Sequence, residues 1–190
     1  APDQVFEFKI DWCYNINNRM EYGGRSGYET FENDVNKVYT IAQFFPRLCV
    51  YNDVEGWQNF QFWGNGEFAL EFGDYEVNIT VPSDHIMEAT GSLLNPKDVL
   101  TRVEYRRFID SNSSFDKPIL IVNQDEAFLK ESSFLKTKST WRYSAKNVRD
   151  FAFASSRKFI WERQAVKVGE NKVMAVSIYP KEGNPLWEDY

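Results

Sequence analysis

The chain has 190 residues, of which 43% are hydrophobic and 17% aromatic. This is about one domain at roughly 150 residues per domain, and the amount of apolar side chain excludes an intrinsically disordered protein. The net charge is −6 and the basic residues are interleaved with acidic ones, so we expect no nucleic-acid partner. No apolar run approaches the roughly 18 to 20 residues of a membrane-spanning helix, so we expect no membrane span.

A strict alternation of side chains predicts the first strand. From Val5 to Ile16 the even positions are aromatic or aliphatic, and the odd positions include Glu7, Lys9 and Asp11. This period of two is typical of a half-buried strand.

Residues 15–36 show no such period, and we predict a long loop. The Gly23–Gly27 stretch within it fits either an ordinary hairpin loop or an anion-binding nest beside Arg25. The hairpin loop is favoured because no phosphate-loop lysine and no following helix accompany the glycines.

Val38 to Tyr51 is predicted as a strand interrupted at Pro46. Further on, apolar side chains alternate on even positions from Phe68 to Phe72 and then on odd positions up to Val81. This change of phase at residues 73–74 indicates a two-residue hairpin turn or a bulge.

Helix signals occur at two places. Asn95 and Pro96 begin a predicted amphipathic helix of about 15 residues, and Asn123 with Glu126 forms a capping-box pattern for a second, short helix. Four further strands are predicted, at residues 119–122, 139–145, 150–154 and 172–179. We therefore predict a mainly β protein, with a large curved antiparallel sheet or β-sandwich and one or two short helices, in a single β-rich domain over residues 1–190.

His85 is the single histidine in the chain. A catalytic zinc usually takes several protein nitrogen ligands, so an independent His-based zinc site cannot be assembled here. A Ser-His-Asp or Cys-His centre remains conceivable for His85, but without a Gly-x-Ser-x-Gly elbow we interpret it as a turn residue. We expect the isolated chain to hold no catalytic zinc and no other cofactor, and to cleave no peptide.

Two further site types can be considered. Glu67, Glu71, Asp74 and Glu76 could supply a glycosidase-like acid and base, although their alternation with apolar residues is also that of a solvated sheet face. Exposed aromatic rings could form a sugar-stacking platform, which would make the chain a secreted carbohydrate- or protein-binding β module.

Cys13 and Cys49 are the two cysteines. They form neither a disulfide framework nor a Cys-x-x-Cys pair, and they leave the redox compartment open. We expect two free thiols rather than a disulfide, which would require Cα atoms within about 7 Å.

Several short motifs together resemble the N-terminal β domain of the aminopeptidase N-like gluzincin zinc metallopeptidases, and most closely a bacterial secreted subgroup. Individually each motif is short, and their order and spacing carry the resemblance over residues 5–190. They are, in chain order, residues 38–47 (VYTIAQFFPR), 51–53 (YND), 56–57 (GW), 66–68 (GEF), 73–82 (GDYEVNITVP), 89–91 (ATG), 147–154 (NVRDFAFA), 179–180 (YP) and 185–187 (PLW).

The resemblance implies a saddle-shaped antiparallel domain beside a thermolysin-like catalytic domain that carries the zinc. The zinc-binding motifs of that second domain do not occur in this chain. We therefore expect a non-catalytic piece of a longer peptidase, with residues 180–190 beginning the linker to the catalytic domain. The implied partners are that catalytic domain and a peptide substrate, and the implied location is extracytoplasmic (periplasmic, cell-surface or secreted) in a Gram-negative bacterium.

In such relatives the N-terminal domain lends one Gln to the active site, where its amide oxygen accepts a hydrogen bond from the free α-amine of the substrate. Gln43 is the candidate by this resemblance, and Arg47 is a second substrate-binding candidate in the same motif. The alternative for Gln43 is a strand residue that bonds locally. A free-standing binding module and a piece of a longer peptidase should also differ in their exposed apolar surface. The piece of a peptidase exposes an apolar patch where its partner domain would pack.

Overall fold

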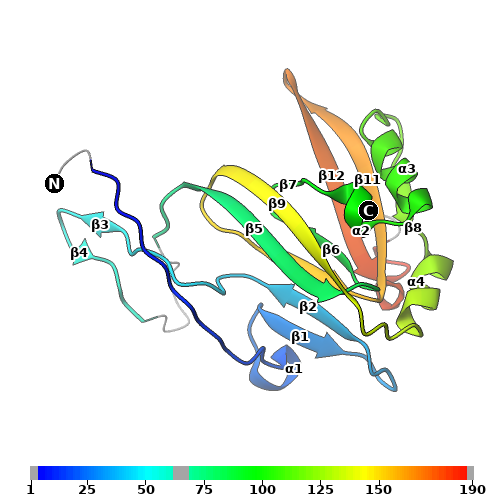
Figure 1. The fold of residues 1–190 in the computed structure, drawn as a ribbon, viewed down its shortest axis with the longest axis horizontal. Coiled ribbons are helices and arrows are strands. Elements are labelled where there is room, and N and C mark those ends of the chain that lie inside the picture. The colour runs from blue at the N-terminus through cyan, green and yellow to red at the C-terminus, as the bar shows by residue number, and fades with distance from the viewer. Residues whose placement is uncertain (1–3, 62–68, 188–190) are drawn as a thin grey trace.

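The computed structural model describes residues 4–61 and 69–187, and most of its regular structure is antiparallel strand (Figure 1). The mainly β prediction is confirmed. The strands form four separate sheets rather than one large sheet, and the described residues contain four short α-helices rather than one or two.

The largest sheet has the order β1-β2-β10-β6, and two three-stranded sheets have the orders β12-β11-β8 and β5-β9-β7. A two-stranded ribbon, β3-β4, completes the set. The strands are β1 (Gly27–Thr30), β2 (Lys37–Ile41), β3 (Tyr51–Asn52), β4 (Gly56–Trp57), β5 (Gly73–Pro82), β6 (Ile86–Ala89), β7 (Ser92–Leu93), β8 (Ile119–Val122), β9 (Lys138–Val148), β10 (Phe153–Ser156), β11 (Phe159–Val168) and β12 (Asn171–Pro180).

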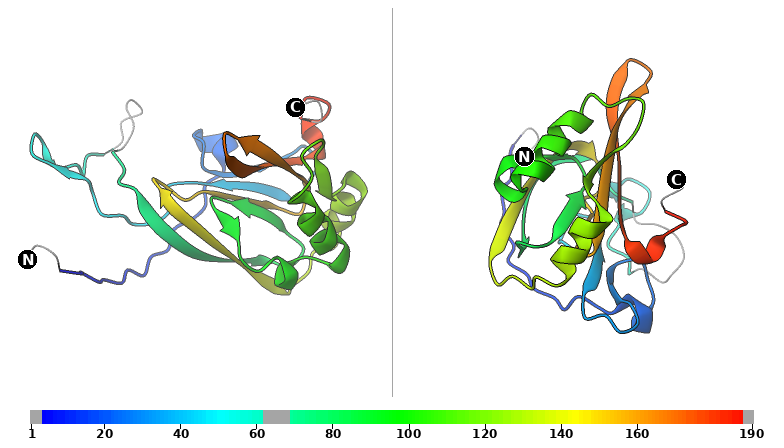
Figure 2. Two further views of the ribbon diagram at one scale, coloured as in Figure 1. Left: turned by 90° about the horizontal axis from the view of Figure 1, so that it is seen from above. Right: turned by 90° about the vertical axis from the view of Figure 1, so that its right-hand side faces the viewer.

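The helices are α1 (Arg19–Tyr22), α2 (Pro96–Val99), α3 (Arg102–Ser111) and α4 (Gln124–Glu131), with a 3₁₀ turn η1 (Lys181–Gly183). Helices α2 to α4 gather at one end of the molecule beside β8 and β11 (Figures 1 and 2). None of the helices in the described part of the chain is long and apolar enough to cross a membrane.

The single helix predicted from residue 95 is in fact two helices. Leu100 is extended, with ψ 147°, and ends α2, and Thr101 then caps α3 with a full capping box to Glu104. The second predicted helix is confirmed, because Asn123 and Glu126 form the capping box that starts α4.

At residues 73–74 the structure has a bulge in the β5-β9 ladder and not a hairpin turn, but the extra residue lies on β9, where residues 146–147 oppose Asp74. The register between β5 and β9 shifts between Gly73 and Tyr75, and the Asp74 carboxylate accepts a hydrogen bond from the Asn147 backbone N–H at 2.9 Å. β5 itself alternates regularly from Gly73 to Val81, so the change of phase arises where the strand begins and not from an extra residue within it. The residues before the bulge, 69–72, are not in a strand, and Phe68 lies outside the described residues.

The strand predicted for residues 5–16 is wrong. Residues 4–16, here called the N-terminal arm, are extended but pair with no strand among the described residues, and Phe6 is 80% exposed. The arm runs away from the sheets (Figures 1 and 2), and the Trp12 indole N–H anchors it by donating to the Phe44 carbonyl at 3.1 Å. A period of two defines a face that could be buried, but a strand also requires a neighbour.

Other segments differ locally from the prediction. The loop expected over residues 15–36 contains α1 and β1, and β6 and β11 were not predicted. Cys13 and Cys49 are exposed, free thiols. In the expected linker, η1 turns the chain back so that the Trp187 ring lies 6.2 Å from that of Tyr179, and residues 188–190 lie outside the described residues.

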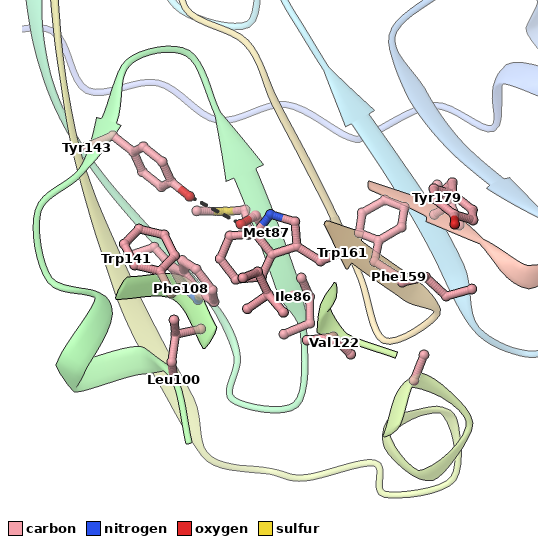
Figure 3. Close-up of a cluster of buried hydrophobic side chains, with 14 of the residues drawn as sticks. Ile86, Met87, Leu100, Phe108, Val122, Trp141, Tyr143, Phe159, Trp161 and Tyr179 are labelled. Carbon is pink, nitrogen blue, oxygen red and sulfur yellow. Dashed lines mark hydrogen bonds between the residues drawn. The ribbon is translucent and has the colours of Figure 1, made fainter. Parts of the chain in front are cut away.

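The hydrophobic core lies where β9, β11 and β6 face α3 (Figure 3). The Trp141 and Trp161 rings are 6.4 Å apart, and Phe108 of α3 packs 5.8 Å from Trp161. The Tyr143 hydroxyl donates to the Met87 carbonyl at 3.2 Å, which satisfies this buried polar group within the core (Figure 3).

A fully buried ammonium joins the ends of several elements. Lys158, between β10 and β11, has a side chain that is 0% exposed and forms ion pairs with Asp34, Glu131 and Glu182. Burial alone lowers the pKa of Lys158, but hydrogen bonds to Asp34 and Glu182 and the charge of Glu131 hold it above its ordinary value. The ammonium is therefore the counter-charge for three carboxylates from separate parts of the chain.

Lys158→Met should destabilise the protein strongly, because Asp34 and Glu182 lose the ammonium that they pair with and Glu131 retains only Lys181. We expect a loss of about 3 to 5 kcal/mol in the free energy of unfolding at pH 7, measured by urea denaturation. The loss should shrink as the pH falls and the carboxylates take up protons. Lys146→Met, at an exposed position of β9, is the control, and an equal effect of the two substitutions would contradict this role.

His85 follows the turn after β5, as predicted, but its ring is buried and not solvated. The residue is 5% exposed, and Nδ1 lies 2.9 Å from the Ser155 hydroxyl oxygen. Burial, with a smaller contribution from the positive charge of Arg157, lowers the pKa of His85 to about 4, although Asp84 opposes the shift. The folded protein thus holds a neutral imidazole.

Because the folded pKa lies below the unfolded one, the His85 contribution to stability is present above pH 6.5 and is lost as the pH falls toward 4. The loss between pH 7 and pH 5 should be about 2 kcal/mol, and His85→Gln should remove this part of the pH dependence. The ring proton signals of this one histidine can be followed by NMR without assignment. A titration midpoint near 6.5 in the folded protein would contradict the buried, neutral ring.

Candidate functional site

The two predicted site residues line the same hollow. Gln43 and Arg47 lie on the segment that follows β2, and with Phe45 they form one wall of a cavity of about 280 Å³. Residues 58–60 and 69–70 form the opposite wall. The structure therefore brings together the two residues that the resemblance selected.

The backbone at Gln43 has an uncommon conformation. Its φ is +51°, in the left-handed region that non-glycine residues rarely occupy, and such conformations cost about 1 to 3 kcal/mol and persist only when neighbours hold them. Both neighbours are held, because the Ser26 hydroxyl bonds the N–H and the carbonyl of Ala42 at 3.1 and 3.2 Å, and Trp12 bonds the Phe44 carbonyl.

The Gln43 side chain is exposed and makes no hydrogen bond within residues 4–61 and 69–187. It also borders a second hollow of about 250 Å³, which lies on the side of Tyr14 and Ser26. The predicted alternative, a strand residue that bonds locally, does not describe it, because Gln43 lies beyond the end of β2. The amide is thus available to a ligand while its backbone is fixed.

Arg47 is held by the fold itself. Nη1 donates to the Asp150 carboxylate at 3.2 Å and Nη2 donates to the Glu71 carbonyl at 3.2 Å. The guanidinium also lies 5.7 Å from the Phe45 ring and 6.0 Å from the Tyr75 ring. These contacts make Arg47 a residue that fixes the cavity wall, and its charge is already paired with Asp150.

Aromatic packing completes this wall. The Phe44 ring lies edge-on to Phe45 at 5.1 Å and to Phe153 of β10 at 5.4 Å, and Phe45 lies edge-on to Tyr75 of β5 at 5.7 Å. The segment after β2 is therefore fastened to its own sheet, through β10, and to the β5-β9-β7 sheet, through β5. Sequence reasoning missed Trp12 and Asp150 as supports of the site, although Asp150 lies in one of the motifs that carry the resemblance.

The arrangement of the described carboxylates gives no support to a glycosidase-like acid and base. Glu71 and Glu76 are exposed, Asp74 bonds the backbone at the β5 bulge, and Glu67 lies outside the described residues. Within the part of the chain that the structure describes, no three His, Cys, Asp or Glu side chains gather in a way that could hold a metal ion.

The exposed aromatic rings on the β3-β4 ribbon bear on the sugar-platform hypothesis. Tyr51 and Trp57 are 62% and 60% exposed, with ring centroids 5.1 Å apart and planes at 66°. A sugar stacks on the flat face of an aromatic ring, and this edge-to-face pair does not present two coplanar faces. The two rings are better described as exposed apolar surface on the β3-β4 ribbon.

Comparison with protein-family models, curated proteins and solved structures finds no match for this chain. The functional assignment therefore rests on the geometry around Gln43 and on the order of the sequence motifs.

The Arg47–Asp150 pair should couple the site to the end of β9. We expect Arg47→Met and Asp150→Asn each to lower the free energy of unfolding by about 1 to 2 kcal/mol and the double variant to lose about 1 kcal/mol less than their sum. Urea denaturation of the four proteins measures this coupling. Arg142 and Asp98, whose side chains are 55% and 61% exposed, are the control pair, and their coupling should be close to zero. Equal coupling in the two pairs would contradict a structural role for Arg47.

Proposed function

We propose that this chain is the non-catalytic scaffold and one cleft wall of a zinc-dependent aminopeptidase-like protein whose catalytic domain lies outside these 190 residues. The observation that carries the proposal is the Gln43 amide, which is unbonded within the described residues and stands on a fixed backbone at the rim of a hollow. Its role is to accept a hydrogen bond from the free α-amine of a peptide.

The chemistry of an exopeptidase supports this role. Such an enzyme must distinguish a free N-terminus from an internal peptide bond, and an acceptor at a fixed position does so by bonding the ammonium group. A neutral amide oxygen accepts this bond without the desolvation cost of a buried charge. Because Ala42 and Phe44 are both held, little conformational entropy is lost when Gln43 engages the substrate.

The surface around the site supports a sub-domain rather than a free-standing module. The N-terminal arm and the β3-β4 ribbon extend from the body of the molecule (Figure 2), and they carry large apolar side chains in contact with solvent. Apolar surface of this extent is typical of a face that packs against a partner. The exposed residues are Val5, Phe6, Phe8, Ile10, Trp12, Tyr14, Ile16, Leu48, Tyr51, Val54, Trp57, Phe60 and Phe72.

The fixed Arg47 has a positioning role in this proposal. It links the Gln43 segment to Asp150 and to the Glu71 carbonyl, so that the acceptor keeps its place relative to the β5-β9 pair. The zinc and the acid–base residues belong to the proposed catalytic domain, and the buried His85 takes no part in them.

In the full-length protein that contains this chain, Gln43→Ala should lower kcat/KM on L-leucine p-nitroanilide by about 10- to 150-fold. The reason is that the substrate ammonium loses one hydrogen bond, worth about 1.5 to 3 kcal/mol when a charged group is involved. The melting temperature should stay unchanged. Gln164→Ala, on β11 and outside the hollow, should leave kcat/KM at the parental value.

A full-length protein without chelator-sensitive aminopeptidase activity would overturn the proposal as a whole. Parental kcat/KM in the Gln43→Ala variant of an active protein would instead remove Gln43 from the site.

A further inference from the structure

A further hollow, of about 460 Å³, lies between the β6-β7 connection, α3 and the β11-β12 hairpin. It shares no lining residue with the hollow at Gln43, so it is a separate feature of the fold. Its volume is in the range of about 300 to 1,000 Å³ that is usual for small-molecule sites.

Arg163 of β11 supplies a buried cation to this hollow. The residue is 8% exposed, and its guanidinium lies 3.8 Å from the centre of the Phe108 ring. Nη1 donates to the Phe108 carbonyl at 3.4 Å and to the Ser111 hydroxyl at 3.3 Å. The Nε atom is buried and has no acceptor within the described residues, so one N–H of a fixed, charged group remains unsatisfied.

Glu88 of β6 supplies an acceptor to the same hollow. Its Oε2 atom is buried and has no hydrogen-bond partner among the described residues. Burial raises the pKa of Glu88 to about 7, and the positive charge of Arg163 opposes this shift. The nearest buried hydroxyl, that of Tyr143, already donates to the Met87 carbonyl.

The charges of Glu88 and Arg163 shift each other's pKa, but the two side chains form no ion pair within 4 Å. The Glu88 carboxyl group and the Arg163 guanidinium thus line one hollow, and each has an atom without a hydrogen-bond partner in the described chain. Such groups are costly to leave unpaired. The rest of the lining is mixed: Leu93, Phe108 and Val176 are among its apolar side chains, whereas Ser92, Asn112 and Lys172 are polar. The Lys172 ammonium already donates to the Asn112 carbonyl at 3.2 Å.

We propose that this hollow binds a small zwitterion with an apolar side chain, of the class of the aliphatic α-amino acids. The ligand ammonium bonds the Glu88 carboxylate, the ligand carboxylate accepts from Arg163 Nε, and the aliphatic chain packs on Leu93 and Val176. A simple anion would leave Glu88 without a hydrogen-bond partner, and a simple cation would leave Arg163 without one. An uncharged apolar ligand would leave both groups without a partner. A zwitterion supplies a hydrogen-bond partner of opposite charge to each of the two groups.

The test is isothermal titration calorimetry of the protein with three probes of similar shape. L-Leucine carries both charges, 4-methylpentanoate lacks the amine, and 3-methylbutylamine lacks the carboxylate. We expect L-leucine to bind. Each singly charged probe should bind at least about 10-fold more weakly than L-leucine, because it lacks one of the two charged hydrogen bonds.

Glu88→Gln should weaken L-leucine binding by about 10-fold or more and leave 4-methylpentanoate binding unchanged. The control is Glu170→Gln, which removes the same charge from the exposed turn between β11 and β12 and should bind L-leucine as the parent does. Arg163→Lys, which retains the charge but loses the Nε donor, should weaken L-leucine and 4-methylpentanoate together. Circular dichroism confirms that each variant is folded before titration.

Absence of L-leucine binding up to about 20 mM, where a Kd of 1 mM would be evident, would overturn the proposal. Binding that Glu88→Gln does not change, or equal binding of all three probes, would overturn it as well. Because the readout is binding and not peptide hydrolysis, its failure is distinguishable from failure of the proposed cleft-wall function.

Discussion

The burial of the Lys158 ammonium is the constraint on which the arrangement of the sheets depends. A charge with 0% exposure is tolerated only when opposite charges surround it, and here they come from the loop between β1 and β2, the end of α4 and the η1 turn. One ammonium thus fixes where the first sheet, the helical end and the last turn meet. Lys181 reinforces the same junction through Glu131 at 2.7 Å.

From this junction the largest sheet runs toward the candidate site. β10 joins β2 to β6, and β2 ends at the segment that carries Gln43. Phe153 of β10 packs on Phe44, and Arg47 ties the segment to Asp150, three residues before the first paired position of β10. The position of the proposed amine acceptor is therefore set by contacts from two sheets, and its uncommon φ angle is maintained by the bonds of Ser26 and Trp12 to its two neighbours.

The hollow at Gln43 and the hollow lined by Glu88 and Arg163 differ in whether their charged groups already have partners. At Gln43 the polar group is neutral and exposed, and the charged residue beside it, Arg47, is already paired with Asp150. In the hollow between β6, α3 and β11, two of the charged residues, Glu88 and Arg163, retain unsatisfied atoms. The first arrangement suits recognition of a group presented by a larger partner across an open cleft. The second suits enclosure of a small ligand that brings both charges with it.

The sequence by itself determined the features that depend on neighbouring residues, namely the capping box at Asn123 and the end of β5 at Pro82, since each is a local backbone or hydrogen-bond effect. It also selected Gln43 and Arg47 through their motif. Only the tertiary structure decided which strands pair, because pairing depends on residues distant in the chain. Hence the alternating pattern of the N-terminal arm did not make it a strand, and the burial that creates the Glu88–Arg163 hollow left no local signal in the sequence.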